Sequence, residues 1–91
     1  MKWLEIIKLR SAKKSSGVLD KIFLPGDEFV QSGLIKIEFY RHAVLESDWS
    51  VHLQWDSDEP LNNGSSLGLR FAQALRDFGL IDHSVWIERE K

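Results

Sequence analysis

The chain has 91 residues and a formal net charge of −2 at pH 7, with 43% hydrophobic and 29% charged residues. This composition indicates one globular domain over residues 1–91 and excludes intrinsic disorder. The lack of a basic surplus argues against a protein that binds nucleic acid, and no apolar run approaches the ~20 residues that cross a bilayer.

The chain contains no cysteine. This excludes disulfides, thiolate nucleophiles and zinc sites built on sulfur. Small secreted domains usually depend on disulfides, so we expect a cytoplasmic protein. A domain of this size without such cross-links is often stabilised by oligomerisation. We therefore expect the partner to be a second copy of the chain, and neither a nucleic acid nor a membrane.

Hydrophobic periodicity predicts the order strand, helix, strand, strand, helix, strand. The predicted strands cover residues 2–10, 34–45, 49–55 and about 82–89, and the predicted helices cover about 18–23 and 67–78. Pro25 and Gly26 end the first helix early, and Gly79 is expected to end the second in a left-handed conformation.

This order predicts an α+β, ferredoxin-like βαββαβ fold, with a four-stranded antiparallel sheet and two helices on one face. The other face of the sheet is not fully polar, because it is expected to carry the side chains of Leu4, Ile6, Leu34, Tyr40 and Trp86. An open apolar face on a small domain favours a homodimer that packs sheet face to sheet face.

A three-residue turn at 46–48 would place His42 opposite His52 and Tyr40 opposite Gln54, on the face away from the helices. Two adjacent imidazoles could bind a metal, transfer protons or make an interface sensitive to pH. A metal would also need Glu38 or a residue of the partner chain. The simpler interpretation is a hydrogen-bonded polar patch, so we expect no metal. If the protein is an enzyme, Tyr40, His42 and His52 are the catalytic candidates.

Trp55 and Phe71 are the candidates for a ligand pocket between the sheet and the helices. The alternative is that these aromatic side chains form the core. The start of the second helix, near Ser65, could hold the anionic group of a ligand, although capping by an asparagine at 62 or 63 is the simpler explanation. His83 is expected at the surface or in a turn.

The strand Ser50–Trp55, the acidic turn Asp56–Glu59 and the closing segment Asp82–Ile87 resemble those of the dimeric α/β-barrel superfamily. The closest class is the antibiotic-biosynthesis-monooxygenase-like domains. The resemblance implies two sheets paired face to face into a barrel. Haem-degrading members use an asparagine on the first strand and a histidine on the second helix. This chain has neither at residues 2–10 or 67–78, so we expect no haem and no other cofactor.

Together these observations predict a homodimer that binds a small hydrophobic or aromatic molecule, as a cofactor-independent monooxygenase-like domain. The residues at hand for such a reaction are Tyr40, His42, His52 and Trp55. The alternative is a non-catalytic regulatory or structural dimer of the same fold, because one fold supports many functions.

Overall fold

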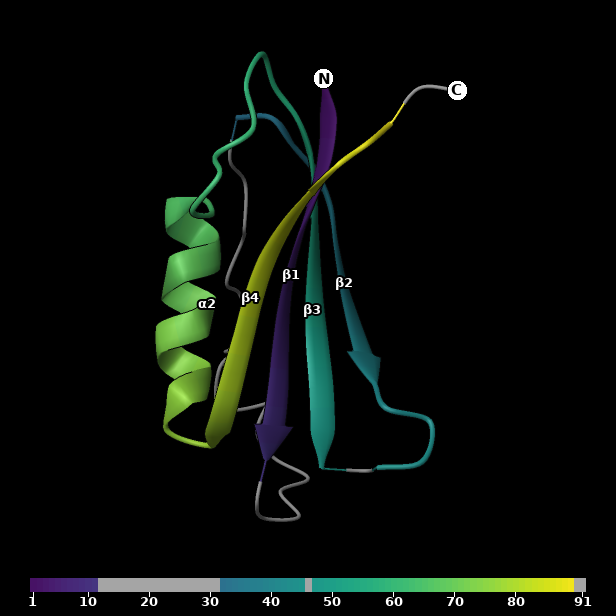
Figure 1. Cartoon of the computed structure of the whole chain (residues 1–91), viewed down its shortest axis with the longest axis vertical. Helices are drawn as coiled ribbons and strands as arrows, with labels where there is room; N and C mark the ends of the chain where they lie inside the picture. Colours follow the sequence, from purple (N-terminus) through teal and green to yellow (C-terminus); the bar gives the residue numbers. More distant parts are fainter. Residues whose placement is uncertain (12–31, 46, 90–91) are drawn as a thin grey trace.

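The computed structural model describes residues 1–11, 32–45 and 47–89. They form four strands and a helix: β1 (Lys2–Ser11), β2 (Leu34–Arg41), β3 (Asp48–Asp56), α2 (Ser66–Arg76) and β4 (Gly79–Ile87). All neighbouring strands are antiparallel, and their order in the sheet is β2-β3-β1-β4. The helix α2 lies along one face of the sheet, where it packs on β1 and β4 (Figure 1).

The predicted ferredoxin-like βαββαβ fold with two helices is wrong for this structure. The described residues have the order β-β-β-α-β, and α2 is the one helix among them. The prediction depended on a short apolar run between Gly17 and Pro25, which lies outside the described residues. A run of this length is a weak basis for a helix, because the first helical turn is costly to form. The dimeric barrel built on that fold is therefore not retained.

The alternation of side chains along β1 and β3 places the core between the sheet and α2. In β1 the odd-numbered residues are buried, and in β3 the same holds for residues 51, 53 and 55. These strands meet one apolar side of α2, as expected for a helix with apolar side chains three and four residues apart. The buried core residues are Trp3, Ile7, Leu9, Val51, Leu53, Trp55, Leu67, Phe71, Ala72 and Leu75.

The start of β4 differs from the sequence-based prediction at Gly79. This residue is not among the described glycines with positive φ, so it does not form the expected left-handed helix cap. It is instead the first residue of β4 and pairs with Ser11. A Cβ atom at position 79 would overlap the backbone carbonyl of Arg10, so glycine is needed here for the close approach of two strands.

The hairpin between β2 and β3 is longer than predicted. The backbone N–H of His42 donates to the carbonyl of Asp48 at 2.8 Å, which closes a loop over residues 43–47. Tyr40 therefore pairs with Ser50, and His52 pairs with Glu38 rather than with His42. The register is shifted by four residues from the predicted one, so the two histidines are not opposite each other. An irregularity between Leu34 and Lys36 adds one residue to β2.

No helix among the described residues is long and apolar enough to span a lipid bilayer.

Candidate functional site

The face of the sheet opposite α2 is covered by no described element, and we call it the open face. The part of this face over the edge strand β2 and its neighbour β3 is polar and contains a cluster of four side chains, those of Glu38, Tyr40, His52 and Gln54. The Tyr40 hydroxyl donates to Glu38 Oε2 at 2.6 Å, and the Gln54 amide donates to Glu38 Oε1 at 2.7 Å. The His52 ring lies against the Tyr40 ring, with centroids 4.6 Å apart. Glu38 thus organises this cluster, and Lys36 Nζ lies 3.5 Å from its carboxylate.

The charges in this cluster follow from its contacts. The hydroxyl of Tyr40 holds the pKa of Glu38 below its usual value, and Lys36 and His52 act in the same direction. The same hydrogen bond raises the pKa of Tyr40, because loss of its proton would place two negative charges together. Burial lowers the pKa of His52, opposed in part by the charge of Glu38. At neutral pH the cluster holds a carboxylate, a neutral phenol and a neutral imidazole.

The structure brings together two of the three catalytic candidates predicted from the sequence. Tyr40 and His52 are in contact, whereas His42 lies in the loop that follows β2. Its Nδ1 accepts hydrogen bonds from the backbone N–H groups of Val44 and Leu45, at 3.1 and 3.0 Å. His42 therefore shapes the loop and is not a partner of His52 for a metal ion. Among the described residues no group of three or more potential metal-binding side chains lies close together.

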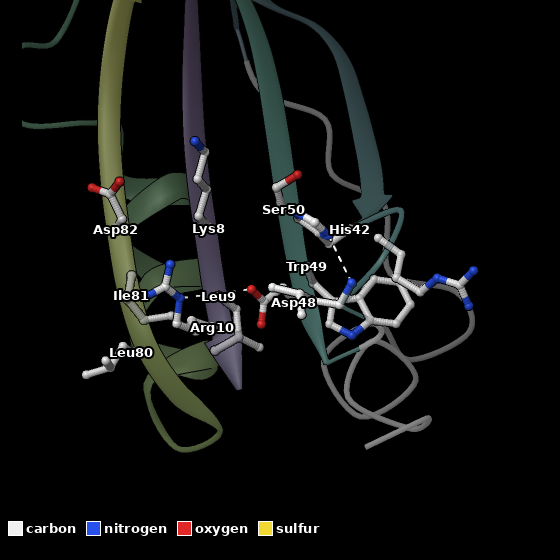
Figure 2. Close-up of a pocket in the computed structure, with 12 residues that line it drawn as sticks. Lys8, Leu9, Arg10, His42, Asp48, Trp49, Ser50, Leu80, Ile81 and Asp82 are labelled. Carbon is white, nitrogen blue, oxygen red and sulfur yellow. Dashed lines mark hydrogen bonds and ion pairs between the residues drawn. The ribbon is translucent and has the colours of Figure 1, made fainter. Parts of the chain in front are cut away.

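A groove of about 560 Å³ lies where the strands approach the β2–β3 loop, and we call it groove A (Figure 2). Its volume is in the range of sites for small molecules. Lys8 of β1 pairs with Ser50 of β3 and with Asp82 of β4. Lys8 alternates with the buried residues of β1, so these three side chains lie on the open face. The lining residues are Lys8, Leu9, Arg10, Arg41, His42, Leu45, Asp48, Trp49, Ser50, Leu80, Ile81 and Asp82.

Groove A combines positive charge with an apolar wall. Three basic residues line it against two acidic ones, in a chain whose net charge is negative. Arg10 lies 4.0 Å from Asp48, whereas Lys8 and Arg41 form no ion pair within the described part of the chain. The indole Nε1 of Trp49 is the one buried side-chain nitrogen or oxygen of the described residues that has no hydrogen-bond partner. Buried donors are rarely left in this state. Groove A thus has two cations without ion pairs among the described residues, beside a tryptophan whose buried N–H is unsatisfied.

A smaller groove of about 320 Å³, which we call groove B, lies at the opposite end of the sheet. Trp55, a predicted pocket residue, lines it together with Trp3 and Trp86. Trp55 is nevertheless only 4% exposed, and its ring stacks on that of Trp3 at a centroid distance of 5.3 Å. Phe71, the other predicted pocket residue, is a core residue of α2 and lines neither groove.

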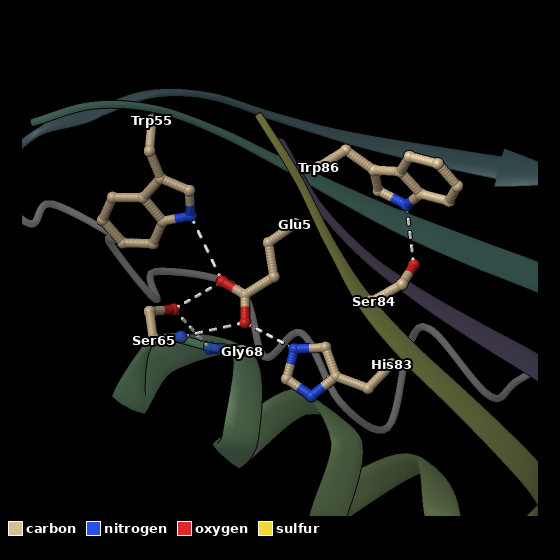
Figure 3. Close-up of polar contacts among 7 residues, drawn as sticks. All are labelled: Glu5, Trp55, Ser65, Gly68, His83, Ser84 and Trp86. Atoms are coloured by element: carbon tan, nitrogen blue, oxygen red, sulfur yellow. Dashed lines mark hydrogen bonds and ion pairs between the residues drawn. The ribbon is translucent and has the colours of Figure 1, made fainter. Parts of the chain in front are cut away.

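The most polar site of the interior was missed in the sequence. Glu5 is a residue of β1, and its side chain is fully buried against the start of α2. Its carboxylate is hydrogen-bonded to Trp55, Ser65 and His83 (Figure 3). Ser65, and not Asn62 or Asn63, caps the helix, because its hydroxyl accepts from the N–H of Gly68. The helix start thus lies against an anion of the chain itself, the carboxylate of Glu5. The available signal was an acidic residue on the apolar side of an alternating strand.

No family model, curated protein or solved structure matches this chain.

Proposed function

We propose that this protein binds a small amphipathic anion in groove A, with a flat apolar body and one carboxylate-like group. The observation that carries the proposal is that Lys8 and Arg41, which form no ion pair among the described residues, line the same groove as several apolar side chains. The ammonium of Lys8, on the open face, would hold the anionic group through charge-assisted hydrogen bonds, whereas Arg41, which pairs with Trp49 and so has the opposite side-chain parity, would add positive charge at the rim of the groove. The indole ring of Trp49 and the leucine and isoleucine side chains would contact the apolar body.

The binding experiment uses 1-naphthoate as the probe, titrated into the protein by isothermal calorimetry. We expect the double variant Lys8→Gln/Arg41→Gln to bind it about tenfold more weakly or worse, because each lost charge-assisted bond contributes roughly 1.5–3 kcal/mol before solvent screening. The matched control is Arg70→Gln, which removes an exposed cation of α2. Equal affinity of the double variant and the wild type would contradict the proposal.

Nuclear magnetic resonance tests the location of the probe separately, through the shifts of the indole N–H resonances of the four tryptophans. Binding in groove A should shift the Trp49 signal most, because Trp49 lines this groove whereas Trp3, Trp55 and Trp86 line groove B. A shift confined to Trp55 and Trp86 would place the probe in groove B instead.

A reaction on the bound molecule is a further part of the hypothesis. The resemblance of the sequence to monooxygenase-like domains implies oxygenation of an aromatic substrate without a cofactor. In support, Tyr40 and His52 are in contact, and Tyr40 pairs with Ser50 of groove A. Burial favours the neutral form of His52, which is the form that can accept a proton from a substrate. The lack of cysteine supports a cytoplasmic location for this activity.

The second candidate function is self-association through the open face, as a non-catalytic dimer. It is favoured by the exposure of large apolar side chains there: Leu80 is 73% and Trp86 59% exposed. Such side chains on a small domain are typical of a surface that packs on another chain.

Sedimentation velocity tests this association with the variants Tyr40→Asp and His52→Asp. Each variant adds a carboxylate close to Glu38, and the buried like charges should weaken the dimer. Arg70→Asp, on the opposite side of the molecule, should leave the dimer intact. A wild-type protein that sediments as a monomer, or variants with unchanged mass, would remove this candidate.

A further inference from the structure

The buried carboxylate of Glu5 has all its acceptor positions filled. Oε1 accepts from the Trp55 indole at 3.2 Å and the Ser65 hydroxyl at 2.7 Å, and Oε2 accepts from the Ser65 backbone N–H at 3.0 Å. His83 Nε2 lies 2.5 Å from Oε2 and completes the set. The indole of Trp55 and the hydroxyl and backbone N–H of Ser65 are all donors, so they satisfy the carboxylate oxygens without exposure to water.

This arrangement determines which ring nitrogen of His83 carries the proton. Nε2 faces a carboxylate oxygen and must donate, so the neutral ring has its lone pair on Nδ1. Figure 3 shows Nδ1 on the ring edge that points away from Glu5. It has no hydrogen-bond partner within the described residues and is not a buried unpaired atom, since Trp49 Nε1 is the only one of those there. The His83 side chain is 16% exposed, so Nδ1 reaches the surface.

Two glycines allow the backbone to lie close to the Glu5 and His83 side chains. A Cβ atom at Gly64 would overlap the His83 ring, and one at Gly68 would overlap the Glu5 carboxylate. Gly64 has a φ of +93°, a conformation that glycine adopts without cost. The backbone at these two glycines therefore lies against the Nε2–Cε1 edge of the ring and against the carboxylate, and among the described residues neither glycine meets Nδ1.

We propose that Glu5 and His83 form a proton-transfer site, in which Nδ1 of His83 acts as a general base toward small uncharged molecules. Glu5 is the positioning residue, because it orients the ring and balances the charge of the imidazolium that forms. The substrates are small because little of the ring is exposed, and uncharged because the adjacent carboxylate repels anions. This site lies on the helix side of the sheet and is independent of groove A.

The probe reaction is the hydrolysis of p-nitrophenyl acetate. The oxygen of a water molecule attacks the acyl carbon and forms a C–O bond with it, while a proton of that water passes to Nδ1 of His83. The bond to the nitrophenolate then breaks, and the proton leaves the imidazolium for the solvent. The products are acetate, nitrophenolate and protons, with no change of oxidation state.

The test compares the wild type with His83→Gln and Glu5→Gln, each checked for folding by circular dichroism. We expect His83→Gln to lose at least about tenfold of the protein-dependent rate, since general bases contribute that much or more. Glu5→Gln should slow the reaction as well, while Arg70→Gln should not. A His83→Gln variant that folds and hydrolyses the ester at the wild-type rate would overturn the proposal.

The tautomer gives a second readout that does not depend on activity. Nitrogen-15 spectra of the histidine rings should show Nδ1 of His83 unprotonated and Nε2 protonated in the neutral wild-type ring. Glu5→Gln should lose this preference, because an amide can either donate to or accept from the ring. A proton on Nδ1 of the neutral wild-type ring would contradict the proposed base, even in a protein that hydrolyses the probe.

Discussion

Gly68→Ala is expected to destabilise the protein by about 2–4 kcal/mol, although alanine is normally the better helix residue. In a helix interior this substitution gains about 1 kcal/mol. At this position, however, the new Cβ would overlap the Glu5 carboxylate, which is held by donors on all sides. Displacing a buried charge from its partners costs about 3–5 kcal/mol, so the overlap outweighs the helix propensity. Urea denaturation gives the free energy of unfolding that checks this sum.

The matched control removes the carboxylate before the methyl group is added. In the background Glu5→Ala, the overlap disappears, and Gly68→Ala should then stabilise the fold. In a double-mutant cycle of the four proteins, the effect of Gly68→Ala on the free energy of unfolding should therefore change sign between the two backgrounds. The account of Gly68 is wrong if the substitution stabilises the protein equally in both backgrounds.

Phe71→Ala should lower the free energy of unfolding by about 3–5 kcal/mol. Phe71 is 4% exposed and belongs to the core that α2 forms with β1 and β3. Its removal leaves a cavity as well as losing apolar burial. Domains of this kind have a total stability of roughly 5–15 kcal/mol, so the variant could be largely unfolded at 37 °C.

The neighbouring Leu69 provides the control for Phe71. It lies on the same helix but is 47% exposed, so Leu69→Ala should change the free energy of unfolding by less than about 1 kcal/mol. Denaturation curves of both variants test whether α2 is oriented as described. Similar losses for the two substitutions would mean that the helix presents a different side to the sheet.

The strands of the sheet were predictable because their residues alternate. The predicted segments 2–10 and 49–55 lie within β1 and β3, and the helix predicted over 67–78 overlaps α2. In β3 residues 49, 51, 53 and 55 are apolar and the alternate residues are polar, and in β1 the buried parity is apolar except for Glu5 and Ser11. This period assigns each residue to a face. The error of four residues in the β2–β3 register is an even number, so it left Tyr40 and His52 on the predicted face.

The identity of the site could not be predicted in the same way. The pair His42 and His52 depended on a short turn, and the observed loop instead uses His42 Nδ1 to bind its own backbone. Glu5 and His83 come from β1 and β4 and are 78 residues apart in the chain. Nothing in their local sequence brings them together, because the contact exists only once β1 and β4 pair and α2 begins beside them.

The sequence by itself determined the segments that form the sheet and α2, and the face to which most strand residues point. These properties are local, since they depend on the period of apolar side chains along a single element. The tertiary structure alone decided the strand register, the basic groove beside Trp49 and the Glu5–His83 pair. These depend on which distant segments become neighbours, and the length of one loop or the space left by one glycine is enough to change them.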